Sequence, residues 1–422
     1  MNILIIGSGA REHAIAWKIS QSQNVKKIYI IPGNAGTSLE KKIKNVKISC
    51  YDIEQILYFA KKKNVVLTIV VSEFLLSLGI VDYFKKAKLN IFGPNKNASL
   101  IESSKSFAKD LMSLYSIPTA KYQVFNKEQE ALKYLFSLRP PFVIKANGLA
   151  KGKGVIITSN MQESKKIVRN MLNGKLFKES GRKIIIEEYI YGKEISFMII
   201  VDKNKNIIPL EISCDYKKLL NNNYGPNTGG MGSYSPYFIN DAVYNKIMNN
   251  IIYPIVDALY IEGFRYEGFL YIGIMIDKNS CPKVIECNCR LGDPEIQSVI
   301  VRLKSDFIDL CFYGLCGKLD LKKIFWNRYY ALTVVMCSKD YPILNSYKEE
   351  KIFGLKNNLQ FNMCKIFHAG TKFKENCFFT NGGRVLSVTA IGKTKLIAKK
   401  NAYKKVKSIF WNNCYYRTDI GI

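Results

Sequence analysis

The first twenty residues contain a short strand, a glycine turn and a helix in that order, and this order restricts the fold more than any other feature. The apolar residues 3–6 precede Gly7-Ser8-Gly9, and residues 14–19 then follow helical spacing. Such a unit is typical of the start of a doubly wound parallel α/β sheet. The turn lacks the third glycine of the dinucleotide fingerprint. We therefore expect the helix N-terminus to bind one phosphate or a polar substrate rather than NAD.

Three more strands are predicted in the first hundred residues, at 27–31, 65–71 and 89–92. Because the carboxyl ends of such strands face the ligand crevice, Glu73 is a candidate ligand for hydroxyl groups or an amine. A helix-capping carboxylate is an equally good interpretation. Glu73 also lies at the centre of the most apolar segment, 65–81, which favours a strand, a turn and a helix over a membrane span.

Residues 141–155 combine a buried strand with a basic glycine-rich loop. The apolar residues 142–144 lead into Lys145, and the loop ends in Lys151-Gly152-Lys153-Gly154. Glycines allow main-chain N–H groups to approach a ligand closely, and a lysine about 4 Å from a phosphate contributes about 4 kcal/mol at an effective dielectric near 20. This predicts a phosphate site, with a solvated basic turn as the alternative. Lys105, at the start of a helix over 103–115, is a second phosphate candidate.

Two later segments have the pattern of nucleotide and substrate loops. A strand over 184–190 contains Glu187-Glu188-Tyr189-Ile190, which suits a hinge that holds a purine, and Glu194 lies close enough to bind ribose hydroxyls. An edge strand with exposed acids is the alternative. The loop 225–232 has four glycines in eight residues, which indicates close approach to a ligand or a flexible loop.

Residues 284–295 form the most specific candidate site. Residues two apart in a strand share a face, so Glu286, Asn288 and Arg290 should point together, with Ile285, Cys287 and Cys289 opposite. A carboxylate and an amide oxygen suit Mg²⁺ that carries ATP phosphates. The alternative is a half-exposed strand with a satisfied ion pair.

Composition bounds the class of protein. The net charge of +29 suggests nucleic acid, but lysine is spread along the whole chain without aromatic-interleaved basic stripes, so we expect no nucleic-acid partner. A basic surface would still attract small anionic substrates. Eleven cysteines, an odd number without CxxC pairs, favour reduced thiols and a cytoplasmic location.

Chain length and pattern changes divide the sequence into three predicted domains. They are 1–102, an α/β substrate domain; 103–326, with a small lid at about 120–190; and 327–422, an α+β cap. The cap should contain strands at 331–336, 364–368 and 385–390 and a helix at about 393–409. His368 is a candidate base, although a structural histidine is the stronger interpretation.

Seven strings, in order along the whole chain, resemble one family. They are GSGAREHA at 7–14, PGNAGT at 32–37, GPNTGGMG at 225–232, ECNCRLGDPE at 286–295, HAGT at 368–371, NGGRVL at 381–386 and DIG at 419–421. Together with the order of the lysines and carboxylates, they resemble the ATP-grasp ligases, and within these the phosphoribosylamine–glycine ligases of purine synthesis.

The resemblance implies an ATP-grasp fold between a doubly wound N-terminal domain and a C-terminal α+β cap. It implies an ATP-dependent ligase that joins glycine to 5-phosphoribosylamine through glycyl phosphate, with ATP as co-substrate and Mg²⁺ or Mn²⁺ as metal. A monomer without a membrane partner is expected. The alternatives are another ATP-grasp carboxylate–amine ligase, a carboxylase acting on a neighbouring purine intermediate, and a catalytically silent relative.

The resemblance also implies roles for single residues. ATP would contact Lys105, Lys145, Lys151, Gly152, Lys153, Gly154, Glu187, Glu188, Tyr189, Ile190 and Glu194, and the metal would bind Glu286 and Asn288. The substrates would contact Gly9, Glu12, Glu73, Asp215, Asn227, Thr228, Gly229 and Gly230, and Arg290 and Asp293 would serve the reaction. The chain departs from the family pattern at Val71-Ser72, Asn147, Cys214, Tyr216 and Leu291.

Overall fold

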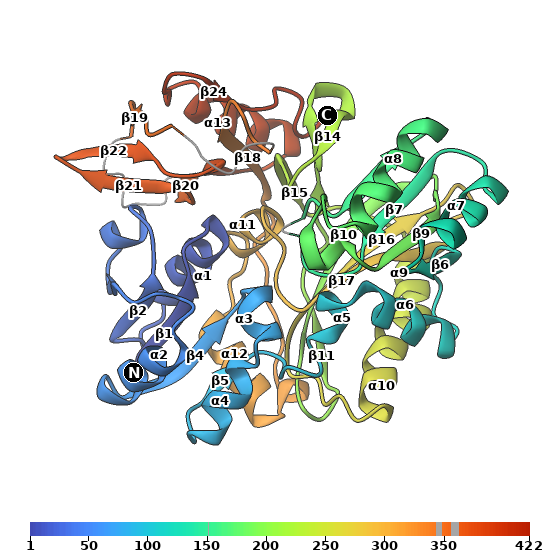
Figure 1. Ribbon diagram of the computed structural model, residues 1–422. Helices are drawn as coiled ribbons and strands as arrows, with labels where there is room; N and C mark the ends of the chain where they lie inside the picture. Colours follow the sequence, from blue (N-terminus) through green and yellow to red (C-terminus); the bar gives the residue numbers. More distant parts are fainter. Residues whose placement is uncertain (151, 343–347, 356–362) are drawn as a thin grey trace.

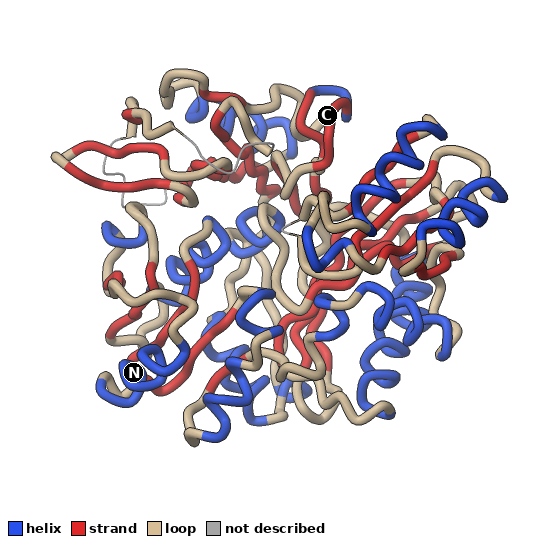
Figure 2. Tube along the Cα trace, in the orientation of Figure 1, coloured by secondary structure: helices blue, strands red, loops and turns tan. Residues whose placement is uncertain are grey.

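The computed structural model describes residues 1–150, 152–342, 348–355 and 363–422, which fold into three parts packed side by side (Figure 1). Each part contains both helices and strands (Figure 2). One sheet is parallel and the larger remaining sheets are antiparallel, so the mixed α/β and α+β class expected from the sequence is confirmed. Within the described ranges, no helix has the length and apolar character that crossing a membrane requires.

The first part is a five-stranded parallel sheet in the order β3-β2-β1-β4-β5. Ile3 and Ile5 pack against α1 on one face, whereas Leu4 and Ile6 pack against α2 and α4 on the other, because successive side chains of a strand alternate. The carboxyl ends of β1 and β4 thus lead into the turns at Gly9 and Glu73. The elements are β1 (Asn2–Gly7), α1 (Ala10–Ser20), β2 (Lys27–Pro32), β3 (Ile43–Asn45), α2 (Ile53–Lys62), β4 (Val65–Val70), α3 (Glu73–Ser77), α4 (Ile80–Lys86) and β5 (Ile91–Phe92).

The middle part contains two antiparallel four-stranded sheets. The smaller sheet, in the order β6-β9-β7-β8, carries α7 and α8 and makes up the segment predicted as a lid, about 120–190. Its elements are β6 (Tyr122–Phe125), α7 (Glu128–Ser137), β7 (Phe142–Ala146), β8 (Val155–Thr158), α8 (Met161–Leu172) and β9 (Ile184–Glu188). The larger sheet, in the order β11-β10-β16-β17, is built from β10 (Lys193–Val201), β11 (Ile207–Pro209), β16 (Gly268–Ile276) and β17 (Pro282–Asn288). The accompanying helices are α5 (Leu100–Ser103), α6 (Lys105–Leu114), α9 (Asp241–Ile247), α10 (Tyr253–Ile261), α11 (Glu295–Ile300) and α12 (Phe307–Cys316).

The last part shares its sheet with the middle of the chain. The strand order of this sheet is β12-β15-β18-β23-β20. The strands are β12 (Cys214–Asp215), β15 (Gly232–Ser235), β18 (Tyr330–Ser338), β23 (Arg384–Gly392) and β20 (Cys364–His368). Helix α13 (Lys395–Val406) packs on β18 and β23, and the other strands are β13 (Lys218–Leu220), β14 (Tyr224–Asn227), β19 (Lys351–Ile352), β21 (Thr371–Lys374), β22 (Cys377–Thr380) and β24 (Cys414–Tyr415). The boundary at 326 remains a prediction; one sheet extends across it and connects the glycine-rich loop 225–232 to the cap.

A buried charge cluster joins the first and last parts. Oε1 of Glu40 contacts Nε2 of His13 at 3.1 Å and Nζ of Lys365 at 2.5 Å. The main-chain N–H of His368 donates to Nδ1 of His13 at 2.9 Å, so Nε2 carries the His13 proton and donates it to Glu40. The cluster therefore holds His13 neutral.

The two histidines predict a loss of stability below neutral pH. Burial lowers the pKa of His13 and lowers the pKa of His368 well below its ordinary value. The unfolded chain would bind protons near pH 6.5 that the folded protein excludes. Each histidine therefore lowers the free energy of unfolding by up to about 1.4 kcal/mol per pH unit as the pH falls below that value. We expect the thermal unfolding midpoint to drop from pH 7 to pH 5, and less so in His368→Gln. An equal midpoint at both pH values would contradict this expectation.

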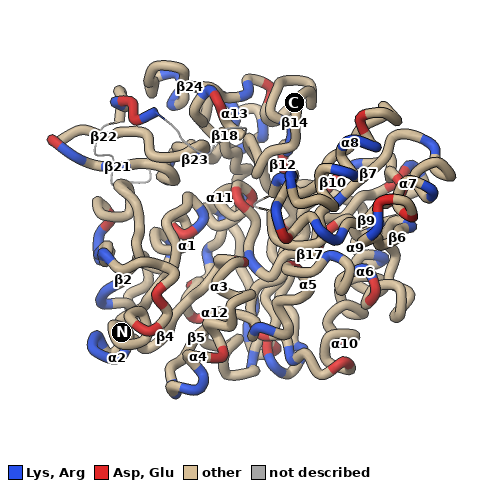
Figure 3. The backbone as a smooth tube through the Cα atoms, viewed as in Figure 1, with Lys and Arg blue, Asp and Glu red and all other residues tan. Residues whose placement is uncertain are grey.

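Basic residues occur throughout the molecule. In Figure 3, Lys and Arg segments are visible in the first part, the lid and the cap, interspersed with Asp and Glu. The net charge of +29 is thus distributed over all three parts in this view.

Candidate active site

Strand β17 brings the predicted metal pair next to the lid. Glu286 and Asn288 are partly exposed and alternate with the buried Cys287 and Cys289. The register shifts between Ile274 and Gly273, which pair with Val284 and Glu286. Ile285 was expected to share the buried face with Cys287 and Cys289, but it is only partly buried, and Val284 is fully buried instead. The carbonyl of Ile285 accepts a hydrogen bond from Nζ of Lys145 at 2.9 Å, so the lysine of the lid lies beside the metal pair.

Lys145 shares a buried carboxylate with a second lysine. Glu187 is 2% exposed, and its two oxygens contact Nζ of Lys145 at 2.9 Å and Nζ of Lys109 at 3.2 Å. Burial lowers the pKa of Lys109 to about 8. The Glu187 side chain is thus engaged by lysines. Lys109 was missed in the sequence, although its position four residues after Lys105 places both lysines on one helix face.

Lys105 is held at the junction between α6 and the lid. Its N–H donates to the carbonyl of Asn147 at 3.0 Å, and its Nζ donates to the carbonyl of Gly148 at 3.2 Å. Oδ1 of Asn147 accepts the N–H of Ser106 at 2.8 Å, a bond that the carboxylate usual in the family could also accept. The departure at Asn147 therefore keeps the N-terminus of α6 capped.

The lid connects to the larger sheet through residues 189–192. The predicted strand ends at Glu188, two residues earlier than expected, and Tyr189 follows with its ring 4.7 Å from that of Tyr191. Oε1 of Glu188 accepts the N–H of Lys121 at 3.1 Å. Among the described residues, no hydrogen bond reaches the main chain of Tyr189 or Ile190. Their N–H and C=O groups are available to the edge of a base.

A half-buried cation links Glu194 to Glu286. Nζ of Lys217, in the turn between β12 and β13, contacts Oε1 of Glu194 and lies 2.9 Å from Oε1 of Glu286. Burial opposes ionisation of Glu286, but the charges of Lys217 and Lys145 lower its pKa to about 2. Lys217 was not identified in the sequence, where it lies in a lysine-rich run.

The glycine-rich loop 225–232 is fixed by the cap. The N–H of Gly229 donates to the hydroxyl of Tyr341 at 2.8 Å, and its carbonyl accepts from Nη1 of Arg384 at 2.5 Å. The Arg384 guanidinium also contacts Asp293, at 2.7 Å to its carbonyl and 3.0 Å to Oδ2. The N–H of Gly230 donates to Oγ1 of Thr228 at 3.0 Å. Gly230 has φ +106°, and a Cβ there would lie 2.3 Å from Pro294, so only glycine fits.

The half-buried Asp215 and the buried Glu295 lie next to this loop. A Cβ at Gly230 would lie 2.8 Å from Oδ1 of Asp215, which has no hydrogen-bond partner in the described part of the chain. Burial, and then the charge of Glu295, raise the pKa of Asp215 well above its ordinary value. Oε1 of Glu295 accepts from Oγ of Ser196 at 3.1 Å. A buried carboxylate oxygen without a partner favours a proton or a cationic ligand.

The lid loop approaches the same glycines. A Cβ at Gly152, which has φ +75°, would lie 3.6 Å from Cα of Gly229. Nδ2 of Asn227 donates to the carbonyl of Val155 at 3.3 Å, and the carbonyl of Gly154 accepts the N–H of Ala146. The main-chain N–H of Lys153 is bonded to Ala150, and Lys151 lies outside the described residues. The two glycine loops therefore form one surface.

The first part contributes the start of α1. The N–H of Gly9 donates to Oε2 of Glu12 at 2.7 Å, so Glu12 is engaged in capping its own helix. A Cβ at Gly9 would lie 3.8 Å from Oδ2 of Asp293. The turn at Gly9 thus meets the N-terminus of α11 and Arg384 at one point.

Glu73 is paired with Arg290, which lies in the bend after β17 and not in the strand as expected. Its Oε2 lies 3.0 Å from Nε of Arg290, which also lies 3.2 Å from Oε1 of the buried Glu102. Burial opposes ionisation of Glu73, but Arg290 and Arg11 hold its pKa below the ordinary value. Glu102 also accepts the N–H of Cys289, the residue that follows β17, at 2.8 Å. Glu102 was not identified in the sequence.

The oxygen donors fit a divalent ion that is shared with phosphate. Glu286 is ionised, and Asn288 supplies a neutral oxygen on the same face. Within the described ranges, no three His, Cys, Asp or Glu side chains form a metal site. Mg²⁺ typically binds one or two carboxylates together with substrate phosphates, so this set fits a metal that arrives with a nucleotide.

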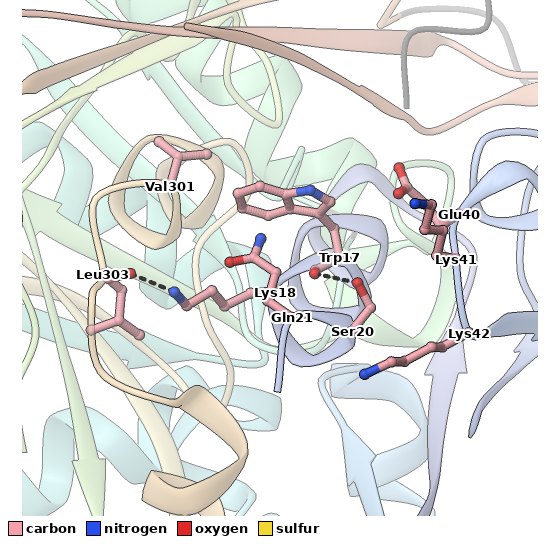
Figure 4. Close-up of a pocket in the computed structure, with 9 residues that line it drawn as sticks. All are labelled: Trp17, Lys18, Ser20, Gln21, Glu40, Lys41, Lys42, Val301 and Leu303. Atoms are coloured by element: carbon pink, nitrogen blue, oxygen red, sulfur yellow. Dashed lines mark hydrogen bonds between the residues drawn. The ribbon is translucent and has the colours of Figure 1, made fainter. Parts of the chain in front are cut away.

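Two other features lie apart from this convergence. His368 is buried against Gly36, and its Nδ1 lies 3.1 Å from Oγ1 of Thr371, as expected for a structural histidine. A pocket of about 420 Å³ opens between α1 and Leu303, lined by Trp17, Lys18, Ser20, Gln21, Glu40, Lys41, Lys42 and Val301 (Figure 4). Within it, Lys18 donates to the carbonyl of Leu303 at 2.5 Å. Its polar groups are largely engaged by the protein itself.

Three family models match this chain in order. The model described as Phosphoribosylglycinamide synthetase, N domain, matches residues 1–102; the ATP-grasp (A) domain matches 103–296; and the C domain matches 331–422. A phosphoribosylamine–glycine ligase of Haemophilus influenzae is 47% identical over 422 residues, covering all of this chain and 98% of the relative. One from Escherichia coli O157:H7 is 46% identical over 424 residues, with 100% and 98% covered.

Solved structures agree. The crystal structure of a phosphoribosylamine–glycine ligase from Thermotoga maritima matches with a TM-score of 0.86 and 32% identity over 100% of both chains. A biotin carboxylase complex from Campylobacter jejuni, at 15% identity, has a TM-score of 0.74 over 98% of this chain and 92% of the other, which shows the shared ATP-grasp fold alone. Full-length identity and a complete set of domain matches lead to one conclusion: the chain belongs to the phosphoribosylamine–glycine ligase family.

Proposed function

We propose that this protein joins glycine to 5-phosphoribosylamine with ATP, giving glycinamide ribonucleotide, ADP and phosphate for purine synthesis. The observation that carries the proposal is the convergence of Lys145 on the strand of Glu286 and Asn288. This convergence is what transfer of a phosphoryl group requires, because triphosphate charge must be neutralised from two sides. Sequence identity over the whole chain to ligases of this name supports the choice of substrates.

We assign the nucleotide to the junction between the lid and the larger sheet. The main chain of Tyr189 and Ile190 would pair with adenine, and Glu194 would accept ribose hydroxyls. Glu187 and Glu188 would position other groups around the nucleotide. Glu187 contacts Lys109 and Lys145, and Glu188 accepts the main-chain N–H of Lys121. The phosphates would meet Lys105, Lys145 and the loop 151–154. Glu286 and Asn288 would hold Mg²⁺ or Mn²⁺, which when bound neutralises charge on phosphate oxygens.

We assign the amino group of a substrate to Asp215. Its buried, unpaired Oδ1 lies under Gly230, beside Glu295, so an ammonium group would supply the missing charge. Glycine bound there would extend its carboxylate toward the phosphate region. We place phosphoribosylamine near Gly9, Glu73 and Arg290, with Glu12 capping the helix beneath it and Asn227, Thr228 and Gly229 forming the wall between the substrates.

The chemistry then needs positioning and no nucleophile from the protein. A glycine carboxylate oxygen attacks the γ-phosphorus and ADP leaves, which gives glycyl phosphate. The amine nitrogen of phosphoribosylamine attacks the carbonyl carbon, loses a proton, and phosphate leaves. Arg290 and Asp293 would orient the reacting groups, and the lysines would neutralise the phosphate charge, so the rate gain comes from orientation and electrostatics.

The substrate requirement tests the function. Purified protein with Mg²⁺ is expected to form ADP only when glycine and phosphoribosylamine are both present, measured by coupled ADP detection and by mass of the product. Equal ADP formation with formate or bicarbonate in place of glycine would reject the assignment and favour a different ligase or a carboxylase.

We also propose a cytoplasmic monomer. All eleven cysteines lie within the described residues, and none forms a disulfide there, in keeping with a reducing compartment. Sedimentation of the purified protein at micromolar concentration should give one species near 48.2 kDa.

A further inference from the structure

Lys217 is a cation placed between two carboxylates that the nucleotide and its metal are proposed to need. Its Nζ contacts Glu194 and lies 2.9 Å from Oε1 of Glu286. The side chains of Lys217, Glu194 and Glu286 are 26%, 30% and 33% exposed, so all three charges are only partly solvated. Their mutual attraction is therefore stronger than that of a surface ion pair.

The main chain fixes Lys217 in this place. Its carbonyl accepts the N–H of Thr228 at 2.7 Å and the Thr228 hydroxyl at 2.9 Å. Thr228 belongs to the glycine-rich loop, whose next residue, Gly229, is held by Tyr341 and Arg384. The main chain of Lys217 is thus held in place by hydrogen bonds, and its side chain can exchange partners.

We infer that Lys217 makes divalent-metal binding at Glu286 depend on the nucleotide. The inference rests on the proposed function, because it takes Glu286 as a metal ligand. The ammonium group occupies one oxygen of that carboxylate, and a metal ion on the other oxygen would lie within a few ångströms of a positive charge. Like charges at that distance repel strongly where solvent is limited. The metal alone should therefore bind weakly.

A triphosphate reverses this balance. Its negative charge offsets both cations, its oxygens offer Nζ of Lys217 a new acceptor, and its ribose offers hydroxyl groups to Glu194. The metal then enters with the nucleotide, and the lysine remains at the phosphate where charge develops. Lys217 is accordingly a specificity-determining residue for the metal–nucleotide complex over the free ion.

A neutral side chain at this position should expose three oxygen donors at once. Lys217→Met would free Glu194 and Glu286 beside Asn288, and carboxylate and amide oxygens are the ligands that Mg²⁺ and Mn²⁺ prefer. Lys217→Arg keeps the charge and should keep the repulsion. Lys205→Met removes a lysine from an exposed pair with Asp257 and serves as the matched control.

The experiment measures Mn²⁺ binding to the nucleotide-free full chain by electron paramagnetic resonance of the free ion. We expect Lys217→Met to bind Mn²⁺ at least about tenfold more tightly than the wild type, with Lys217→Arg and Lys205→Met unchanged. With ADP present, the difference between Lys217→Met and wild type should shrink. Lys217→Gln replaces the methionine variant if thermal unfolding shows the latter to be unfolded.

Unchanged or weaker Mn²⁺ binding by a folded, neutral variant would overturn the inference, as would an equal gain in Lys217→Arg. The readout requires neither glycine nor phosphoribosylamine. If Lys217→Met binds Mn²⁺ more tightly as expected but the wild type forms no glycine-dependent ADP, this inference stands and the proposed substrates are rejected. The opposite pair of results would reject the inference alone.

Discussion

Glu286→Gln is expected to lower kcat by at least about 10³-fold while the protein stays folded. Glutamine keeps the size and the oxygen of the side chain but removes the charge that a phosphate-bound metal needs. Lys217, which is paired with Glu286 at 2.9 Å, retains Glu194 as a partner and is not left without a carboxylate. The loss should therefore appear in turnover and in metal affinity, measured as ADP release at saturating substrates across a range of Mg²⁺ concentrations.

The matched control is Glu262→Gln, which changes the same group at an exposed site. Oε1 of Glu262 accepts the hydroxyl of Tyr115 at 2.8 Å, a bond that an amide oxygen can also accept. We expect wild-type turnover and an unchanged thermal midpoint. If Glu286→Gln retained more than a tenth of the wild-type rate, the metal would have to bind elsewhere.

Local sequence patterns were enough to predict the strands that carry the site. The apolar runs ending at Lys145 and Glu286 belong to strands in the structure, and the period of two in Glu286-Cys287-Asn288 placed the two oxygen donors on one face. Such features depend on neighbours only a few residues away, so they are readable from the chain. The glycines of the loop 225–232 indicated close packing, and the structure agrees, because Gly230 has no room for a side chain.

The partners of these residues were not readable, because they come from distant segments. Arg384 is 155 positions from Gly229, and Glu102 is 187 positions from Cys289. A lysine-rich composition hides Lys109 and Lys217 among many solvated lysines, and only packing distinguishes them. Glu187 shows the same limit: its place in the strand was predicted, but two buried lysines determine what its carboxylate contacts.

The cap contacts the glycine-rich loop through Arg384, and Arg384→Met is expected to weaken substrate use. This change removes the donor to the Gly229 carbonyl and the cation beside Asp293. Charge-assisted bonds of this kind contribute about 1.5–3 kcal/mol each, so we expect kcat/KM for glycine or phosphoribosylamine to fall about 10- to 100-fold. The KM for ATP should change little, because Lys105, Lys145 and residues 187–190 form no hydrogen bond or ion pair with Arg384 among the described residues. Steady-state kinetics with each substrate varied in turn measures both quantities.

Two further variants separate positioning from stability. Arg384→Lys keeps the charge, but a lysine cannot contact the Gly229 carbonyl, the Asp293 carbonyl and Oδ2 of Asp293 with one planar group. It should therefore recover only part of the loss. Arg302→Met removes a buried arginine, which donates to the hydroxyl of Ser235 at 3.0 Å and to the carbonyl of Tyr329 at 2.6 Å. It should lower the thermal midpoint without a selective change in KM. A similar KM pattern in Arg302→Met and Arg384→Met would mean that Arg384 only stabilises the fold. A selective effect of Arg384→Met would mean that Arg384 positions the glycine-rich loop 225–232 for the substrates.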